Sequence, residues 1–438
     1  MIRLEFEWSD APDEGDRLES RTMARLMLSI DDQVLTRVHD RSTRSQREGI
    51  VIPLHPLAEW LVTQWWSLLY EPWPFRADIP GPGRSADPAV RAWLHRHCLR
   101  TAVPGFASPY VCIFGQGRDV ALVGRSDSGD RYQATPVKFL HDIEVSLDRD
   151  DLRGALTRVV EAVLTRLEDL DEPRVAALRT DWLAICSASA QEAEFCRAAG
   201  RLGLDPLDVP SWPPNVASWF ERTPDGELDS ALAMDLLETP DPPTVKPAQH
   251  AMFEQMVQQL GIQSAMPACG PRFDHAAFHD GYRFAEWIRR ALAIADDDSF
   301  DDLRDASKVA CDRAFVLEPA SIPEGGSLAL TGWRAHSVPV IAARSTGPLQ
   351  TRRFLWARAL YLALRGSARG PRLVTDSRTW DQRASRAFGA ELLAPRVGVV
   401  AQFEAAAQRF GRDEALLQVA EHYNVSPMVI RHQLDNAA

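Results

Sequence analysis

Apolar and polar positions alternate in the first 150 residues in a way that predicts strands with one buried face. Between residues 22 and 38, apolar Ala24, Leu26, Leu28 and Ile30 alternate with other residues, the pattern breaks at Asp31-Asp32, and it resumes with Val34 and Val38, as in a β-hairpin. Strand-like runs return at 110–124, with a turn at Gly115-Gln116-Gly117, and at 136–147. The stretch 56–72 instead has apolar residues at helical spacing. Residues 1–149 are therefore expected to form an α+β domain.

The spacing of apolar residues becomes helical after this domain. Residues 150–206 begin with acidic residues suited to a helix start, continue with an apolar stripe, and contain Ser189 as a candidate helix cap. Residues 207–249 are rich in proline, which predicts a semi-extended connector with only short helical pieces. Residues 250–438 alternate helix-like and strand-like segments, so the predicted fold class for the chain is α+β.

Length and composition narrow the class of protein. A chain of 438 residues exceeds the size of a single ordinary domain, and two or three domains are expected. The net charge of -12 argues against a protein whose main partner is a nucleic acid backbone. The first residues lack the pattern of a secretory signal, and no apolar run has the length of a membrane span. We therefore expect a cytoplasmic protein without a membrane segment, and the six cysteines are expected as free thiols.

Four segments of the C-terminal region occur in an order that resembles a known family. They are an amphipathic "GYRFAEWIRRALAI" segment, the "RRF" triplet at 352–354 followed by Ala357 and Leu360, the stretch "FGAELLAP" at 388–395, and the closing segment "LLQVAEHYNVSPMVIRHQLDN". Together they resemble the ImmA/IrrE metallopeptidase family over about residues 275–438. The resemblance implies a zincin-like α+β domain with a closing helix pair. It also implies a protein partner such as a helix-turn-helix repressor or an antitoxin-like factor.

The residues that bind zinc in this family are replaced here. The family motif R-R-F-x-x-A-H-E-x-x-H places two His ligands four residues apart on one helix face, with a Glu as general base. The corresponding positions hold Arg358, Ala359 and Leu362, and the third ligand is expected near Gln382 or Ala384. Arg358, Ala359, Leu362 and Ala384 offer no ligand atom for zinc and no base for water at neutral pH. Gln382 offers only a weakly binding amide oxygen. The sequence thus predicts a non-hydrolytic regulatory protein, with no catalytic residue and no metal cofactor at this site.

Two carboxylates remain near the altered motif. They are Asp381 and Glu391, and one hypothesis is that the Arg358 guanidinium occupies the vacated metal position and pairs with one of them. The alternative is that Arg358 faces the solvent.

Two other functions stay open at this stage. An atypical zinc metallopeptidase could recruit His275 and His279, which are four residues apart, or Glu391. A DNA-binding regulator could use the second helix of the closing pair. The DNA-contacting candidates are Arg431, His432 and Gln433, although the acidic net charge and the acidic residues that flank this helix argue against it.

Overall fold

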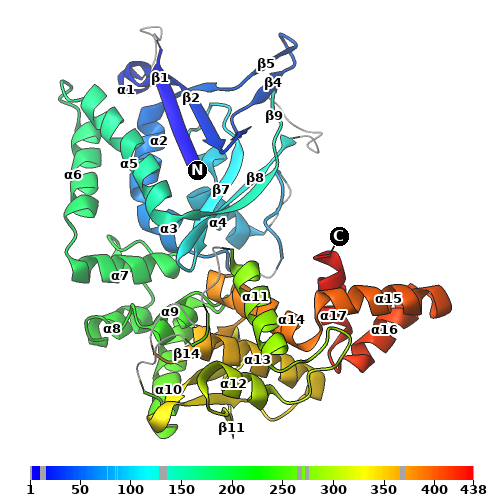
Figure 1. Ribbon diagram of the computed structural model, residues 1–438. Coiled ribbons are helices and arrows are strands. Elements are labelled where there is room, and N and C mark those ends of the chain that lie inside the picture. Colours follow the sequence, from blue (N-terminus) through cyan, green and yellow to red (C-terminus); the bar gives the residue numbers. More distant parts are fainter. Residues whose placement is uncertain are drawn as a thin grey trace. The chain divides into compact units, whose positions relative to one another are not determined.

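The protein consists of two compact units, Met1–Trp212 and Pro213–Ala438 (Figure 1). Within its described residues, the chain forms seventeen α-helices and fourteen strands, which confirms the α+β class. No helix in the described part is long and apolar enough to cross a lipid bilayer. The computed structural model describes residues 2–9, 16–75, 77–83, 85, 87–127, 136–263, 269–271, 276–365 and 370–437.

The first unit is built on an antiparallel sheet with one buried face. β1 (Ile2–Trp8) pairs along its length with β2 (Met23–Ile30), and β2 also pairs with β3 (Gln33–Val34) and β6 (Ile50–Pro53). Asp31 makes the turn between β2 and β3 with a φ of 50°. The alternate residues of β2 are buried, namely Ala24, Leu26, Leu28 and Ile30. The predicted hairpin is therefore confirmed as far as Val34, whereas Val38, expected on its second strand, belongs to a strand of another sheet.

Two three-stranded sheets complete the β structure of this unit. One contains β7 (Tyr110–Gln116), β8 (Asp119–Arg125) and β10 (Ile143–Asp148). The other contains β4 (Val38–Asp40), β5 (Ser45–Arg47) and β9 (Val137–Phe139). Gly117 takes a φ of 71° at the turn between β7 and β8, one end of the turn predicted there.

Helices cover the main sheet of the first unit. α2 (Leu54–Thr63), α3 (Trp65–Tyr70) and α5 (Arg149–Arg166) share one hydrophobic core with β1 and β2. α6 (Pro173–Ser187) adds Trp182 to the same core, so the helices expected as a separate middle segment belong to the first unit. Its remaining helical elements are α1 (Arg17–Arg21), α4 (Pro88–His97), η1 (Leu99–Thr101), α7 (Ala190–Arg201) and η3 (Val209–Ser211).

The proline-rich segment expected as a connector is folded into the second unit. It forms α8 (Pro214–Arg222), α9 (Ala231–Leu237) and η4 (Pro243–Val245), and α10 (Lys246–Gln259) follows. Proline occupies one of the first two positions of α8, η4 and α10, where its missing N–H costs no hydrogen bond. Apolar residues of α9 and α10 pack in one cluster with the sheet of this unit: Leu232, Leu236, Phe253, Leu330, Ala342 and Leu373.

A buried ammonium group ends α9. Lys246 Nζ donates to the carbonyl oxygens of Leu236, Leu237 and Thr239 at 2.8, 2.9 and 2.9 Å. These carbonyls lie where a helix leaves acceptors without intrahelical donors, and a positive charge is favoured at this end. Burial lowers the pKa of Lys246 to about 7.

The centre of the second unit is a four-stranded sheet in the order β11-β13-β12-β14. β11 (Val316–Pro319) pairs parallel with β13 (Val338–Ala343), while β12 (Ser327–Arg334) pairs antiparallel with both β13 and β14 (Arg372–Thr375). The short helix η5 (Ala335–Ser337) makes the turn from β12 to β13. The paired strands predicted in this region are confirmed.

Seven helices surround this sheet or follow it. All seven contribute apolar residues to one core with it, and the first four are α11 (Ala277–Ala291), α12 (Leu303–Cys311), α13 (Leu349–Arg365) and α14 (Trp380–Leu393). The last three are α15 (Arg396–Phe410), α16 (Arg412–His422) and α17 (Pro427–Asp435). The closing helix pair predicted from the sequence is confirmed as α16 and α17, which lie beside each other in Figure 1.

Replacing Lys246 with Met should destabilise the chain because the carbonyls at the end of α9 lose their buried donor. We expect the free energy of unfolding in urea to fall by about 1–3 kcal/mol. Lys308→Met is the matched control, since Lys308 forms an exposed ion pair with Asp305, and its effect should stay below about 1 kcal/mol. Equal stability of the two variants would contradict the capping role of Lys246.

Candidate functional site

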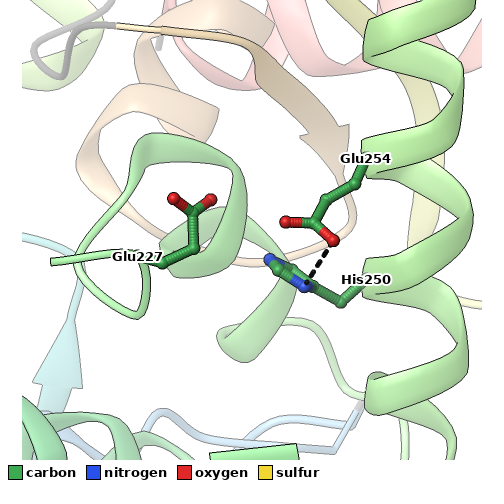
Figure 2. Close-up of side chains that lie close together, drawn as sticks. All are labelled: Glu227, His250 and Glu254. Atoms are coloured by element: carbon green, nitrogen blue, oxygen red, sulfur yellow. Dashed lines mark ion pairs between the residues drawn. The ribbon is translucent and has the colours of Figure 1, made fainter. Parts of the chain in front are cut away.

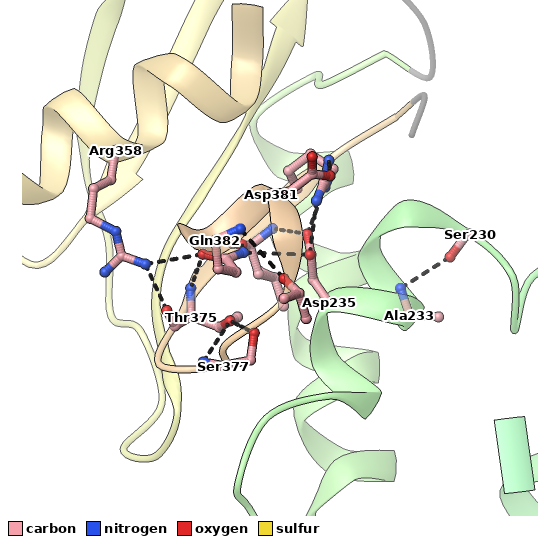
Figure 3. Close-up of polar contacts among 11 residues, drawn as sticks. Ser230, Ala233, Asp235, Arg358, Thr375, Ser377, Asp381 and Gln382 are labelled. Carbon is pink, nitrogen blue, oxygen red and sulfur yellow. Dashed lines mark hydrogen bonds and ion pairs between the residues drawn. The ribbon is translucent and has the colours of Figure 1, made fainter. Parts of the chain in front are cut away.

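Arg358 lies on α13, at the position predicted from the family resemblance to replace the first zinc ligand, and it is buried, with 4% of its surface exposed. Its Nη2 donates to Thr375 O at 2.7 Å and to Gln382 Oε1 at 3.0 Å (Figure 3). Its Nε donates to Ser385 Oγ at 3.3 Å. The guanidinium is therefore held by neutral acceptors from β14 and α14.

Both hypotheses for Arg358 are wrong. The side chain does not face solvent, and among the described residues it forms an ion pair with neither Asp381 nor Glu391. Burial lowers the pKa of Arg358 well below its usual value, the charge of Arg386 lowers it further, and Asp376 partly opposes this. Arg358 pairs with neither Asp381 nor Glu391 because each of these carboxylates is already bound to other donors.

Asp381 belongs to a buried group of three charges. Arg372 donates to Asp235 from Nε at 2.7 Å and from Nη2 at 3.0 Å, and its Nη1 lies 2.8 Å from Asp381 Oδ2. Figure 3 shows Asp235 on α9 and Asp381 on α14 meeting at this point. Burial lowers the pKa of Arg372, but the two carboxylates raise it above its usual value. The group joins α9, β14 and α14.

Glu391 is hydrogen-bonded to residues of α15 and α17. Only 3% of it is exposed, and it accepts hydrogen bonds from Gln433 Nε2 at 2.8 Å and from Arg396 N at 3.2 Å. Burial raises the pKa of Glu391. Gln433 also donates to Ala394 O at 2.8 Å, so it is a buried structural residue, whereas Arg431 and His432 on the same helix are exposed. Of the three residues proposed for DNA contact, two are on the surface.

The expected positions of the third metal ligand are filled by packing. Gln382 is fully buried, and it accepts from Thr375 N at 3.0 Å and donates to Leu373 O at 2.6 Å. Ala384 lies against α11, where a Cβ added to Gly281 would be 2.3 Å from Ala384 O. Because two helix backbones touch there, only glycine fits at 281.

The remaining motif positions also lie in the core. Ala359 and Leu362 belong to the hydrophobic cluster that α13 shares with the sheet, and both are buried. Ala359, which the family resemblance predicts in place of the general base, thus presents a buried methyl group. No residue at the five altered positions presents a carboxylate or an imidazole.

Of the two histidines considered for zinc, the structure describes only His279. His279 is exposed on α11, with its ring 4.3 Å from that of Phe278, and His275 lies outside the described residues. Asp280, next to His279, is buried and accepts from Tyr361 Oη at 2.6 Å, and it also pairs with Arg365. Among the described residues, His279 belongs to no group of three possible metal ligands.

A different cluster of ligand-type side chains lies in and directly after the segment expected as a connector. Glu227 comes from the loop before α9, and His250 and Glu254 come from α10; Figure 2 shows the imidazole beside both carboxylates. One ligand atom from each residue lies within 4.8 Å of the others. His250 Nδ1 is 3.7 Å from Glu254 Oε2. Among the described residues, this is the only such group of three.

Burial shapes the titration of this cluster. It lowers the pKa of His250, an effect that the charge of Glu227 partly offsets, and it raises the pKa of Glu254. The sequence gives only a weak signal for these residues. The His250-x-x-x-Glu254 spacing is typical of one helix face, but the proline-rich composition before it predicts a connector, and Glu227 has no local signal.

Comparisons of the chain with protein-family models, with curated proteins and with solved structures find no match. The resemblance to the ImmA/IrrE family therefore stays a prediction from the sequence.

Replacing Arg372 with Met should leave two buried carboxylates without their cation. We expect the free energy of unfolding to fall by about 3–5 kcal/mol in urea titrations. Adding Asp235→Asn and Asp381→Asn should recover part of this loss, since the uncompensated charges are then removed. A triple variant no more stable than Arg372→Met would show that buried charge is not the cause.

Replacing Gly281 with Ala should force α11 away from α14. The expected loss is about 1–3 kcal/mol of unfolding free energy, measured by circular dichroism in urea. Gly154→Ala is the matched control, because Gly154 also lies in a helix, but a Cβ added there would meet only Arg158 Nη1, at 4.0 Å. That control should be neutral or stabilising by up to about 1 kcal/mol. A tolerated Gly281→Ala change would contradict the close contact of the two helices.

Proposed function

We propose that the protein is a non-hydrolytic regulatory protein that binds a protein partner and leaves it intact. The observation that carries this proposal is the buried arrangement around Arg358, where the positions of zinc ligands and general base in the ImmA/IrrE family hold other side chains. In this proposal the domain keeps the architecture of such a peptidase and has lost its chemistry.

The chemical argument follows from what peptide hydrolysis needs. A metallopeptidase requires a Lewis acid that activates water and a base that accepts its proton. The Arg358 guanidinium is cationic and has no lone pair for a metal, and the Ala359 methyl group cannot accept a proton. The Arg358 side chain, hydrogen-bonded to Thr375 and Gln382, occupies the space at this position. The proposed role is therefore recognition without cleavage.

The class of partner comes from the family resemblance. It is a helix-turn-helix repressor or an antitoxin-like factor, bound in the cytoplasm during a stress, phage or mobile-element response. Exposed apolar side chains on α15, α16 and α17 support the proposal of a protein contact there, since burial of apolar surface favours protein association. Four of them are more than half exposed: Val397, Phe410, Leu417 and Met428.

A DNA-binding role for α17 is the weaker alternative. Arg431 and His432 are exposed there, but Asp435 lies on the same helix and Glu421 on the one before it. The chain as a whole carries a net charge of -12. A groove-reading helix needs a positive surface around it, and this helix has little.

The test captures a partner from extract of the source cells and then measures binding with purified components. We expect a complex in which the partner keeps its intact mass after incubation with and without added Zn²⁺. The double variant Leu417→Glu/Met428→Glu should bind at least about tenfold more weakly, because charge enters the apolar contact. Leu183→Glu is the matched control, since Leu183 is 58% exposed in the first unit.

Two outcomes would contradict the proposal. Cleavage of the partner that depends on Zn²⁺ would show an atypical metallopeptidase. Salt-sensitive binding to duplex DNA, without a protein partner, would show a DNA-binding regulator.

A further inference from the structure

We propose that the second unit binds a divalent transition-metal ion of the Zn²⁺ class through Glu227, His250 and Glu254 (Figure 2). This site is separate from the altered motif around Arg358, and the inference does not rest on the proposed function. It concerns a segment, 213–260, for which the family resemblance implies nothing.

The three side chains are placed as metal ligands require. His250 and Glu254 are four residues apart on α10 and so share one helix face. Glu227 approaches from the loop before α9, so the ligands come from two elements. Their ligand atoms lie within 4.8 Å of one another, and the ligands of one tetrahedral zinc lie about 3.3 Å apart, given bonds of about 2 Å. Side-chain rotations of modest size close this difference.

The imidazole supplies a second, independent observation. His250 is 3% exposed, and its Nε2 is buried without a hydrogen-bond partner among the described residues. The separation of 3.7 Å between Nδ1 and Glu254 Oε2 is also too long for a hydrogen bond. A buried polar atom without a partner costs about 1–3 kcal/mol, and a metal–nitrogen bond would remove that cost.

The surroundings hold the imidazole in place for such a bond. The Trp219 ring of α8 packs 5.4 Å from the His250 ring, which limits its movement. The side chains of Glu227 and Glu254 are only partly buried, so an ion can enter from solvent.

The ligand set selects the class of ion. Imidazole with carboxylates suits Zn²⁺ and neighbouring transition metals, whereas Ca²⁺ and Mg²⁺ are bound by oxygen ligands. Three protein ligands leave at least one coordination position for water. Two carboxylates with one neutral imidazole offset the charge of a divalent ion.

Metal binding at this place would fasten the loop at 223–230 to α10. Ser230, at the end of that loop, caps α9 by accepting a hydrogen bond from Ala233 N at 3.2 Å. Ligation of Glu227 would therefore also restrain the start of α9. An ion that binds the folded chain alone raises its stability by mass action.

The experiment uses the full chain without a polyhistidine tag, stripped with a chelator and dialysed. Zn²⁺ is titrated in competition with a fluorescent indicator, and Co²⁺ is added to a second sample to record its visible absorption. We expect one equivalent of Zn²⁺ to bind and the midpoint of thermal unfolding to rise with added Zn²⁺. Glu254→Gln and His250→Gln should each weaken binding at least tenfold and abolish the Co²⁺ absorption band.

Glu254→Gln keeps the test valid if His250→Gln fails to fold. The Glu254 side chain is 42% exposed and keeps nearly the same shape as glutamine. His279→Gln on α11 is the matched control and should bind Zn²⁺ like the wild type. Less than a tenth of an equivalent bound by the wild type at micromolar Zn²⁺ would overturn the proposal. So would unchanged binding by folded Glu254→Gln, or loss of binding by His279→Gln.

Discussion

The buried charges of Arg372, Asp235 and Asp381 are the constraint on which the second unit depends. A guanidinium in the interior is tolerated only when carboxylates or carbonyls accept its donors, since desolvation otherwise outweighs the attraction. Arg372 meets this condition with one carboxylate from α9 and one from α14. The same contacts therefore decide that α9 folds against the sheet, and that the segment around it is part of the unit.

The ion pair of Asp381 with Arg372 determines which acceptors remain for Arg358. With that carboxylate committed to Arg372, Arg358 is left with the Thr375 carbonyl, Gln382 and Ser385. Gln382 is suited to this place because its amide both accepts from Arg358 and donates to Leu373 O. Polar side chains that hydrogen-bond to one another thus occupy the region where the family resemblance predicts an altered metal site. Rigidity of this region comes from hydrogen bonds and helix packing.

Much of the fold follows from local patterns in the sequence, while the contacts between distant residues do not. The hairpin of β2 and β3, the helix α5 and the order of elements from α11 to α14 follow from the spacing of apolar residues. The segment 207–249 departs from its prediction because proline at a helix start has the same appearance in a sequence as proline in an extended linker. Asp235 and Arg372 are 137 residues apart, and no local pattern connects them. Glu227 is likewise separated from His250 by the whole of α9.

The burial of the Lys246 amine allows opening of the second unit to be measured by chemical modification. The chain contains three lysines, Lys138, Lys246 and Lys308, and Lys246 is the one whose amine lies in the interior with 2% exposure. An acylating reagent reaches this nitrogen only when α9 and α10 separate, whereas the exposed Lys308 reacts at once. The extent of acylation at Lys246, read by mass spectrometry relative to Lys308, therefore measures how often this part of the second unit opens under native conditions.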